Sequence, residues 1–386
     1  MLVRSRAPDS LLRHHRVPRG YGTGVTAASP ATRVDIDLGQ DVAELTATLI
    51  DIPSESGSEA ALADGVERAL RALPALSVAR SGNSVIAKTQ LGRAERVVIA
   101  GHLDTVPSAG NFPHRREDDR IWGLGSADMK GGLAVSLRLA RRLAAPLRDV
   151  TFVYYDCEEI QASRNGLARI ATQDPELLAG DFAILMEPSN ARVEAGCQGT
   201  LRIELSSRGR RAHSARSWMG RNAIHELAPA LATLANYQPA TVSVCGLDYR
   251  EGLNAVAVRG GIAGNVIPDT AVLTVNYRYA PGCSQAQALA HVRQLFSDFE
   301  IELIDAAPAA LPGLDRPAVR SFVAATGHPA APKYGWTDVA RFSALGVPAV
   351  NYGPGDPSVA HSPDESVRVA ELIECERVLQ TWLGQA

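Results

Sequence analysis

The sequence predicts an α/β protein in which a sheet flanked by helices is interrupted by a smaller α+β domain. Strand-like and helix-like patterns alternate from about residue 40 to 190, which is typical of a largely parallel sheet covered by helices. After Gly196 the strands become half-polar, and their order changes to β-α-β-β-α-β. That order predicts an open-faced, ferredoxin-like α+β domain inserted into the first domain.

The chain of 386 residues is long enough for two domains, and the change of pattern sets their boundaries. We expect residues 34–197 and 307–386 to form one domain and residues 198–306 to form the insert. Residues 1–33 carry six arginines against one acid and have no apolar segment, so they do not read as a signal peptide. We expect a disordered basic tail there, with a targeting role as the alternative.

Composition narrows the class of protein and its partners. The chain is 46% hydrophobic and 21% charged with a net charge of −3, which is ordinary for a soluble globular protein. This charge favours neither nucleic acid nor an anionic membrane surface as a partner. The five cysteines are odd in number and form no CxxC pair, which favours reduced thiols and a cytoplasmic location. No apolar run approaches the roughly 20 residues that span a bilayer.

Periodicity locates the elements of the first domain. The run VVIA is continuously apolar, as in a strand buried on both faces. Serine and glutamate stand at the start of the second predicted helix in the manner of a cap. The predicted helices are 42–52, 54–73, 131–147 and 165–173, and the predicted strands are 84–89, 96–102, 149–156 and 181–187.

The same criteria locate the later elements. Strand-like alternation covers 200–209, 242–247, 254–264, 270–280 and 301–307, and helical spacing covers 221–237 and 284–299. A helix over 318–327 and a strand within 347–355 then return the chain to the first domain.

Polar residues stand at the carboxyl ends of three of the predicted buried strands. His102 and Glu187 end two of these strands, and Glu158 and Glu159 follow the end of the third after one intervening residue. In sheets of this kind, ligands bind outside the carboxyl ends of the strands. Asp128 lies where the loop GLGS enters a helix, and His361 lies in a loop near the C-terminus.

These residue types suit a metal site, although each one alone has a structural explanation. Asp128 by itself could be a helix cap, and the adjacent glutamates could be first-turn acids. Imidazole nitrogen and carboxylate oxygen are ligands that zinc accepts, and paired ions can share one carboxylate. The joint pattern therefore predicts that Asp128 is a carboxylate shared by two metal ions.

The neighbouring residues supply the remaining chemistry. His102 and Asp104 are two positions apart and point the same way on an extended segment, so the acid can orient the imidazole. The two adjacent glutamates can divide the work, one binding metal while the other moves a proton.

Five segments together resemble the M20 family of metallopeptidases and deacylases from about residue 37 onward: GHLDTVP, GLGSADMKGG, the EE of DCEEI, MEPS and AHSPDE. The resemblance implies a zinc-hydrolase-type mixed sheet with an inserted dimerisation or lid domain. It also implies two Zn²⁺ (or Co²⁺) ions per subunit and a cis peptide bond between Asp128 and Met129.

The resemblance further assigns a role to each residue of the predicted site. One ion would be held by His102, Asp128 and Glu187, and the other by Asp128, Glu159 and His361. Glu158 would be the general base and Asp104 the partner of His102.

Within this family, the segments RGRRAHSARSWMGRNAIH and GWTDVARFSALGVPAVNYGPGD are most similar to the branch that hydrolyses N-succinyl-LL-2,6-diaminopimelate. That likeness implies a homodimer in which His213 reaches the partner's site and stabilises the oxyanion. It also implies that Arg278 anchors a substrate carboxylate and that Asn265 makes a second substrate contact. From the residues alone, Arg278 could equally be a solvated strand residue and His213 an ordinary loop histidine.

The final motif HSPDE departs from that branch, which more often has lysine after the histidine. In this respect the motif is more similar to acetylornithine deacetylases and other aminoacylases. An acetylornithine deacetylase, another N-acyl-amino-acid deacylase or a dipeptidase is therefore the alternative. A non-catalytic binding module is the alternative from another class, and it would be expected to have lost a ligand or the base.

Overall fold

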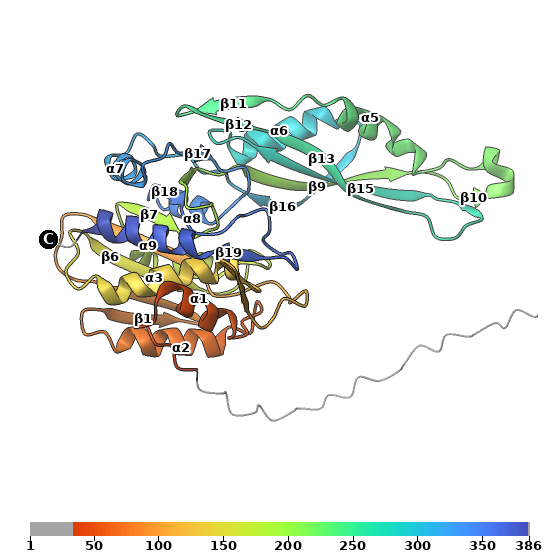
Figure 1. Cartoon of the computed structure of the whole chain (residues 1–386). Coiled ribbons are helices and arrows are strands. Elements are labelled where there is room, and N and C mark those ends of the chain that lie inside the picture. The colour runs from red at the N-terminus through yellow and green to blue at the C-terminus, as the bar shows by residue number, and fades with distance from the viewer. Residues whose placement is uncertain (1–33, 385–386) are drawn as a thin grey trace, which may run out of the picture. The chain divides into compact units, whose positions relative to one another are not determined.

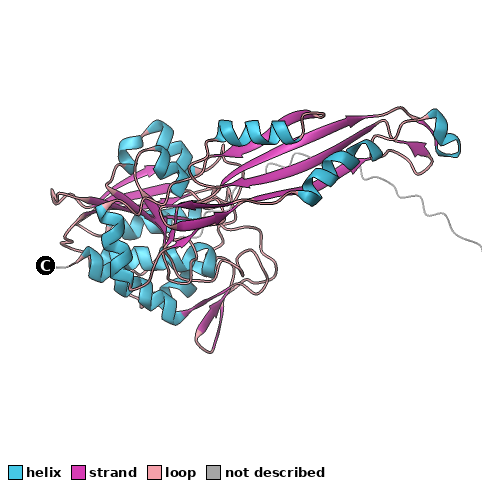
Figure 2. Ribbon diagram, turned by 90° about the horizontal axis from the view of Figure 1, so that it is seen from above, coloured by secondary structure: helices cyan, strands magenta, loops and turns pink. Residues whose placement is uncertain are grey.

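The computed structural model describes residues 34–384, so the basic tail expected over residues 1–33 lies outside the described part. Two larger sheets organise the described chain (Figure 1). One has eight strands in the order β1-β2-β6-β3-β7-β18-β8-β17, and the other has four in the order β13-β15-β9-β16. Helices flank strands throughout (Figure 2), which confirms the predicted α/β class.

The eight-stranded sheet is mixed, with a parallel centre. The strands β6 (Asp149–Tyr155), β3 (Arg96–His102), β7 (Phe182–Leu185) and β18 (Ala349–Asn351) run parallel to their neighbours in that order. At one edge β1 (Ser77–Ser81) and β2 (Ser84–Lys88) form a hairpin, and β2 is antiparallel to β6. At the other edge lie β8 (Glu194–Ala195) and β17 (Ala331–Pro332). The sheet is therefore mixed, as the resemblance implied, and the strand patterns alone did not predict this hairpin, whose two-residue turn can join only antiparallel strands.

Helices cover both faces of this sheet. One face packs against α1 (Val42–Ile50), α2 (Ala60–Arg71), α3 (Gly131–Arg142), α7 (Pro317–Thr326) and α9 (Val369–Leu383). The other packs against α4 (Gly166–Gln173) and α8 (Val339–Ala344). Every residue of β6 is buried as a result, and so is every residue of β3 after Arg96, as the continuous apolar run VVIA predicts.

The four-stranded sheet has the predicted ferredoxin-like order. Its strands are β9 (Gly199–Arg208), β13 (Gly252–Gly260), β15 (Thr270–Tyr279) and β16 (Glu300–Ala307). All neighbours are antiparallel, and α5 (Ala228–Asn236) and α6 (Gln285–Leu295) complete the pattern. The domain limits at residues 198 and 306 stay a prediction.

Small elements complete the described chain. A three-stranded sheet contains β19 (Ser366–Arg368), β5 (Arg120–Trp122) and β4 (Arg115–Glu117). The short pairs are β10 (Ala212–His213) with β14 (Val266–Ile267), and β11 (Thr241–Val244) with β12 (Leu247–Arg250). In the described part, no helix combines the length and apolar character that crossing a membrane requires.

Two predicted helices begin later than expected. The second predicted helix begins at Ala60 rather than at residue 54, and Glu59 at its N-cap makes no side-chain capping bond, so the predicted cap was wrong. Gly57, with a φ of 91°, bends the chain just before it. In the insert, α5 begins at Ala228, with Pro229 in its first turn, where proline is favoured.

The start of α3 approaches the backbone after β7 closely. A Cβ atom at Gly132 would lie 2.3 Å from the carbonyl oxygen of Met186. This close approach brings the residues at the start of α3 next to the end of β7.

We expect Gly132→Ala to lower the free energy of unfolding by about 1–3 kcal/mol, because the added methyl overlaps main-chain atoms that cannot rotate away. Alanine normally makes a helix about 1 kcal/mol more stable than glycine does. A lower free energy of unfolding would therefore show that the overlap with Met186 outweighs this gain. Denaturant unfolding measures the change. Gly264→Ala, with nothing within 4 Å of its added Cβ, is the control and should be neutral. Equal stability of the two variants would contradict this packing.

Candidate metal centre

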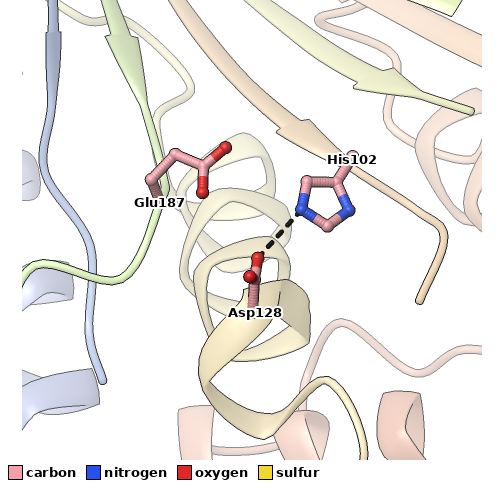
Figure 3. A group of neighbouring side chains, drawn as sticks. All are labelled: His102, Asp128 and Glu187. Atoms are coloured by element: carbon pink, nitrogen blue, oxygen red, sulfur yellow. Dashed lines mark hydrogen bonds and ion pairs between the residues drawn. The ribbon is translucent and has the colours of Figure 1, made fainter. Parts of the chain in front are cut away.

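The predicted ligands converge at the carboxyl ends of the parallel strands. His102 is the last residue of β3, Glu158 and Glu159 follow β6, and Glu187 follows β7. Asp128 lies in the turn Ser126–Lys130 that leads into α3, and its peptide bond to Met129 is cis, as the resemblance implied. Figure 3 shows His102, Asp128 and Glu187 with their polar ends directed toward one another.

The two oxygens of Asp128 face different histidines. Oδ1 lies 3.0 Å from Nε2 of His102, and Oδ2 lies 3.3 Å from Nε2 of His361. His361 also lies 2.8 Å from Oε1 of Glu159. Within residues 34–384, three groups have ligand atoms within 4.8 Å of one another: His102, Asp128 and Glu187; Asp128, Glu159 and His361; and His102, Glu158 and Glu159. Asp128 belongs to two of them, which is the arrangement a shared carboxylate requires.

The electrostatics of this cluster fit divalent cations. Burial, with the nearby charge of Asp128, raises the pKa of Glu187 to about 8. Burial and the charge of Asp338 raise the pKa of Glu158 well above its usual value. Carboxylates so close together destabilise one another unless positive charge balances them. Imidazole and carboxylate donors are also the set that zinc and similar ions accept, so the residues present fit the two implied ions.

The histidines are held by their neighbours in the orientation that ligands need. Nδ1 of His102 lies 2.9 Å from the main-chain oxygen of Asp104 and donates to it, which leaves Nε2 facing Asp128. The Asp104 carboxylate is farther from Nδ1, at 3.6 Å. Hydrogen bonds with Asp128 and Glu159 raise the pKa of His361 to about 10.

The Asp104 carboxylate mainly supports the pair of glutamates. It accepts the N–H groups of Glu158 and Glu159, each at 3.0 Å, and the hydroxyl of Ser56 at 2.7 Å. Burial raises the pKa of Asp104, but the neighbouring His102, together with the bonds from Ser56 and Glu158, lowers it to about 2. Asp104 therefore connects His102 to the turn after β6.

Glu365 is a site residue that sequence reasoning missed. Its carboxylate is buried and accepts the N–H groups of Gly125, Ala127 and Asp128, each at 3.0 Å. Glu365 thereby fixes the loop that presents Asp128. The available signal was an acid four positions after His361 in a motif already singled out.

Asp338, in the segment GWTDVARF, was also missed. It is fully buried, accepts a hydrogen bond from Asn165 at 2.9 Å and pairs with Arg341. Asn165 caps α4, at the far end of the loop that carries Glu158. Asp338 thus supports that loop, and its charge adds to the effect of burial in raising the pKa of Glu158.

Three predicted residues are not among the side chains that the structure groups around Asp128. The ring of His213 is exposed and accepts the N–H of Ala215 at 3.1 Å. Asn265 lies beside it, because its main-chain oxygen accepts the N–H of Ser214 at 2.9 Å. Arg278 lies on β15, half-buried, and burial together with Arg202 lowers its pKa.

Known proteins resemble the chain over most of its length. The model of peptidase family M20/M25/M40 matches residues 98–385. The chain is 56% identical to a putative succinyl-diaminopimelate desuccinylase, DapE, of Mycobacterium tuberculosis, covering 90% of this chain and 99% of that protein. It is 45% identical to the succinyl-diaminopimelate desuccinylase of Corynebacterium glutamicum, covering 91% and 98%.

Solved structures with low sequence identity share the fold. A tripeptidase from Staphylococcus aureus has a TM-score of 0.72 at 20% identity, covering 89% of this chain and 97% of that one. An M20 family metallo-carboxypeptidase from Sulfolobus solfataricus has a TM-score of 0.72 at 18% identity, covering 89% and 98%. A dinuclear metal binding peptidase of the M20 family from Bacillus subtilis has a TM-score of 0.64 at 15% identity, covering 89% and 96%.

We expect metal binding to release protons and to tighten as the pH rises. Before metal binds, Glu187 and His361 have pKa values of about 8 and 10, so both hold a proton at neutral pH. A ligand must lose its proton, so affinity should rise about tenfold per pH unit for each proton displaced, over roughly pH 6–8. Calorimetric titration of metal-depleted protein with Zn²⁺, in buffers of different ionisation enthalpy, counts the protons. Affinity independent of pH would contradict this arrangement.

Proposed function

The chain belongs to peptidase family M20/M25/M40, and on that basis we infer that it is a succinyl-diaminopimelate desuccinylase, a metal-dependent amidohydrolase. The reaction hydrolyses N-succinyl-LL-2,6-diaminopimelate to succinate and LL-2,6-diaminopimelate, in diaminopimelate and lysine biosynthesis. The observation that carries this inference is the near full-length identity with desuccinylases from two organisms. The five free cysteines support a cytoplasmic location.

Two metal ions, Zn²⁺ or Co²⁺, would be held on either side of Asp128. His102 and Glu187 complete one ligand set, and Glu159 and His361 complete the other. The contacts of the two Asp128 oxygens with separate histidines support this division. When bound, such ions lower the pKa of a water molecule and polarise the amide carbonyl.

Glu158 is left free by this assignment to act as the general base. It takes a proton from the attacking water and then delivers it to the leaving amine. Burial raises its pKa well above the usual value, which supports both steps because a more basic carboxylate is the better proton acceptor from water. Asp104 fixes the main chain of Glu158 throughout.

The proposed homodimer accounts for the residues that lie apart from the site. Strand β13 is at the edge of its sheet, and Val256 and Val258 on it are 57% and 60% exposed. An unpaired apolar edge favours pairing with a second copy. His213 and Asn265 lie side by side in the insert, where they can serve the partner's site together. His213 would stabilise the oxyanion, Asn265 would contact the substrate, and Arg278 would bind a substrate carboxylate bidentately.

We expect kcat/KM for N-succinyl-LL-2,6-diaminopimelate to exceed that for N-acetylornithine by about 100-fold or more, because a site built for a charged acyl group rejects one that lacks the charge. Product assay on the Zn²⁺-loaded protein measures both. Glu158→Gln, purified in parallel, is the control for contaminating activity and should bind metal but lose turnover. Faster hydrolysis of N-acetylornithine or of dipeptides would contradict the proposal.

A further inference from the structure

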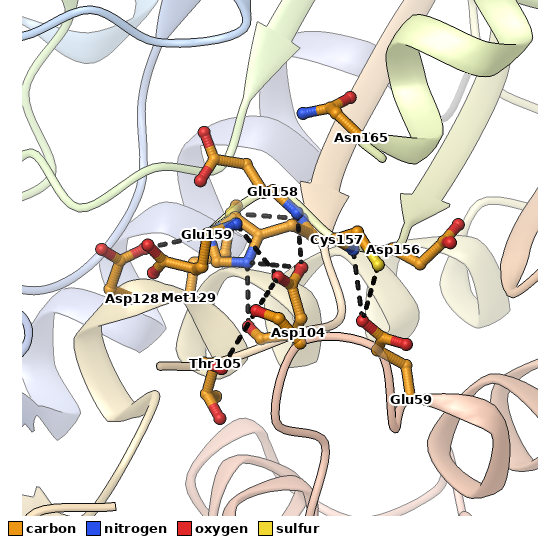
Figure 4. Close-up of polar contacts among 12 residues, drawn as sticks. Glu59, Asp104, Thr105, Asp128, Met129, Asp156, Cys157, Glu158, Glu159 and Asn165 are labelled. Carbon is orange, nitrogen blue, oxygen red and sulfur yellow. Dashed lines mark hydrogen bonds and ion pairs between the residues drawn. The ribbon is translucent and has the colours of Figure 1, made fainter. Parts of the chain in front are cut away.

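The turn that carries Glu158 and Glu159 is held by three consecutive main-chain N–H groups. Those of Glu158 and Glu159 donate to Asp104, and that of Cys157 donates to Oε1 of Glu59 at 3.3 Å. Figure 4 shows the two carboxylates lying on the same side of this turn. Asp104 therefore holds two of the three groups and Glu59 holds the third.

The backbone at Cys157 explains why the turn needs such partners. Its φ is 58°, in the left-handed region that residues other than glycine seldom occupy. A change of hand in a turn leaves successive N–H groups without helix or strand partners, and nearby carboxylates can accept them. The thiol of Cys157 also donates to Oε1 of Glu59, at 3.3 Å. Glu59 thus accepts from both donor groups, N–H and S–H, of the residue that bends the turn.

Glu59 is itself rigidly placed. It is fully buried, accepts the N–H of Gly57 at 2.6 Å and accepts the side-chain N–H of Asn83 at 3.3 Å. It does not cap α2, although it occupies the N-cap position. Ser56, three residues earlier, donates to Asp104. The short segment before α2 therefore supports the turn through both carboxylates.

We propose that Glu59 is a positioning residue that fixes the turn Cys157–Glu159, and so sets where the Glu158 and Glu159 side chains point. The proposal rests on the proposed function for the roles of those two glutamates. In this proposal, Cys157 needs a buried acceptor to stay in the left-handed conformation. If Cys157 relaxes, the main chain of Glu158 and Glu159 rotates, and Glu159 leaves its place beside His361.

The test compares Glu59→Ala, Glu59→Asp and Glu59→Gln in the full chain, with exposed Glu55→Ala as the matched control. Alanine removes the acceptor, aspartate keeps the charge but falls short of Cys157, and glutamine keeps an acceptor oxygen. For Glu59→Ala and Glu59→Asp we expect the Zn²⁺ affinity of the weaker of the two metal sites to fall about 10–100-fold. This is the range seen when a residue that orients a ligand is lost. We expect kcat to fall similarly and KM to change less than about threefold. Glu59→Gln and Glu55→Ala should stay near wild type.

A rescue variant separates positioning from general stability. In Glu59→Asp combined with Cys157→Gly, glycine adopts the left-handed conformation without strain. Recovery of Zn²⁺ affinity and kcat relative to Glu59→Asp alone supports the proposal. Failure to recover, with thermal unfolding unchanged between the two, overturns it.

Metal affinity keeps this test independent of the substrate assignment. Titration of metal-depleted protein with Zn²⁺ against a chromophoric chelator needs no turnover. If the wild type does not hydrolyse the succinyl substrate but Glu59→Asp still weakens Zn²⁺ binding, only the proposed function fails. If Glu59→Asp binds two Zn²⁺ ions as tightly as wild type and turns over as fast, the positioning role fails.

Discussion

The repulsion among buried carboxylates at one edge of the sheet is the constraint on which the rest of the structure depends. Asp128, Glu159 and Glu187 lie within ligand distance of histidines, with Glu187 buried and the other two carboxylates only slightly exposed. Two divalent cations would remove that repulsion, and no neutral ligand would. The raised pKa of Glu187 and of Glu158 shows how strongly the protein alone disfavours their charged forms. Metal binding and the ionisation of the site are therefore one equilibrium.

A buried carboxylate holds each of the two turns that present these acids. Glu365 accepts three N–H groups from the loop before α3, and Asp104 accepts two from the turn after β6. A buried carboxylate that collects main-chain donors fixes backbone that no helix or strand supports. Glu365 and Asp104 are each distant in sequence from the turn that they hold, so the ligands come together only in the folded chain. Such a site is rigid before its substrate arrives, as electrostatic catalysis requires.

The sequence predicted the features that local patterns control. Strand-like apolar patterns identified β3, β6 and β7, and the polar residues at their ends were placed at one edge because parallel strands share their carboxyl ends. The antiparallel hairpin β1–β2 and the late start of α2 were missed, since tight turns decided them. Glu365 and Asp338 were missed because their partners are remote in sequence. The placement of His213 beside Asn265 depends on the pairing of β10 with β14, which no periodicity reveals.

The two larger sheets differ in burial, and their proposed roles differ accordingly. The eight-stranded sheet is covered on both faces and brings together the proposed ligands, whereas the four-stranded sheet leaves the β13 edge exposed.

The direct test of a carboxylate shared by two ions is anomalous diffraction at the zinc edge from crystals grown with Zn²⁺. We expect two peaks about 3.5–4 Å apart, one beside each oxygen of Asp128. A single peak, or a pair that does not contact Asp128, would contradict the shared-carboxylate site.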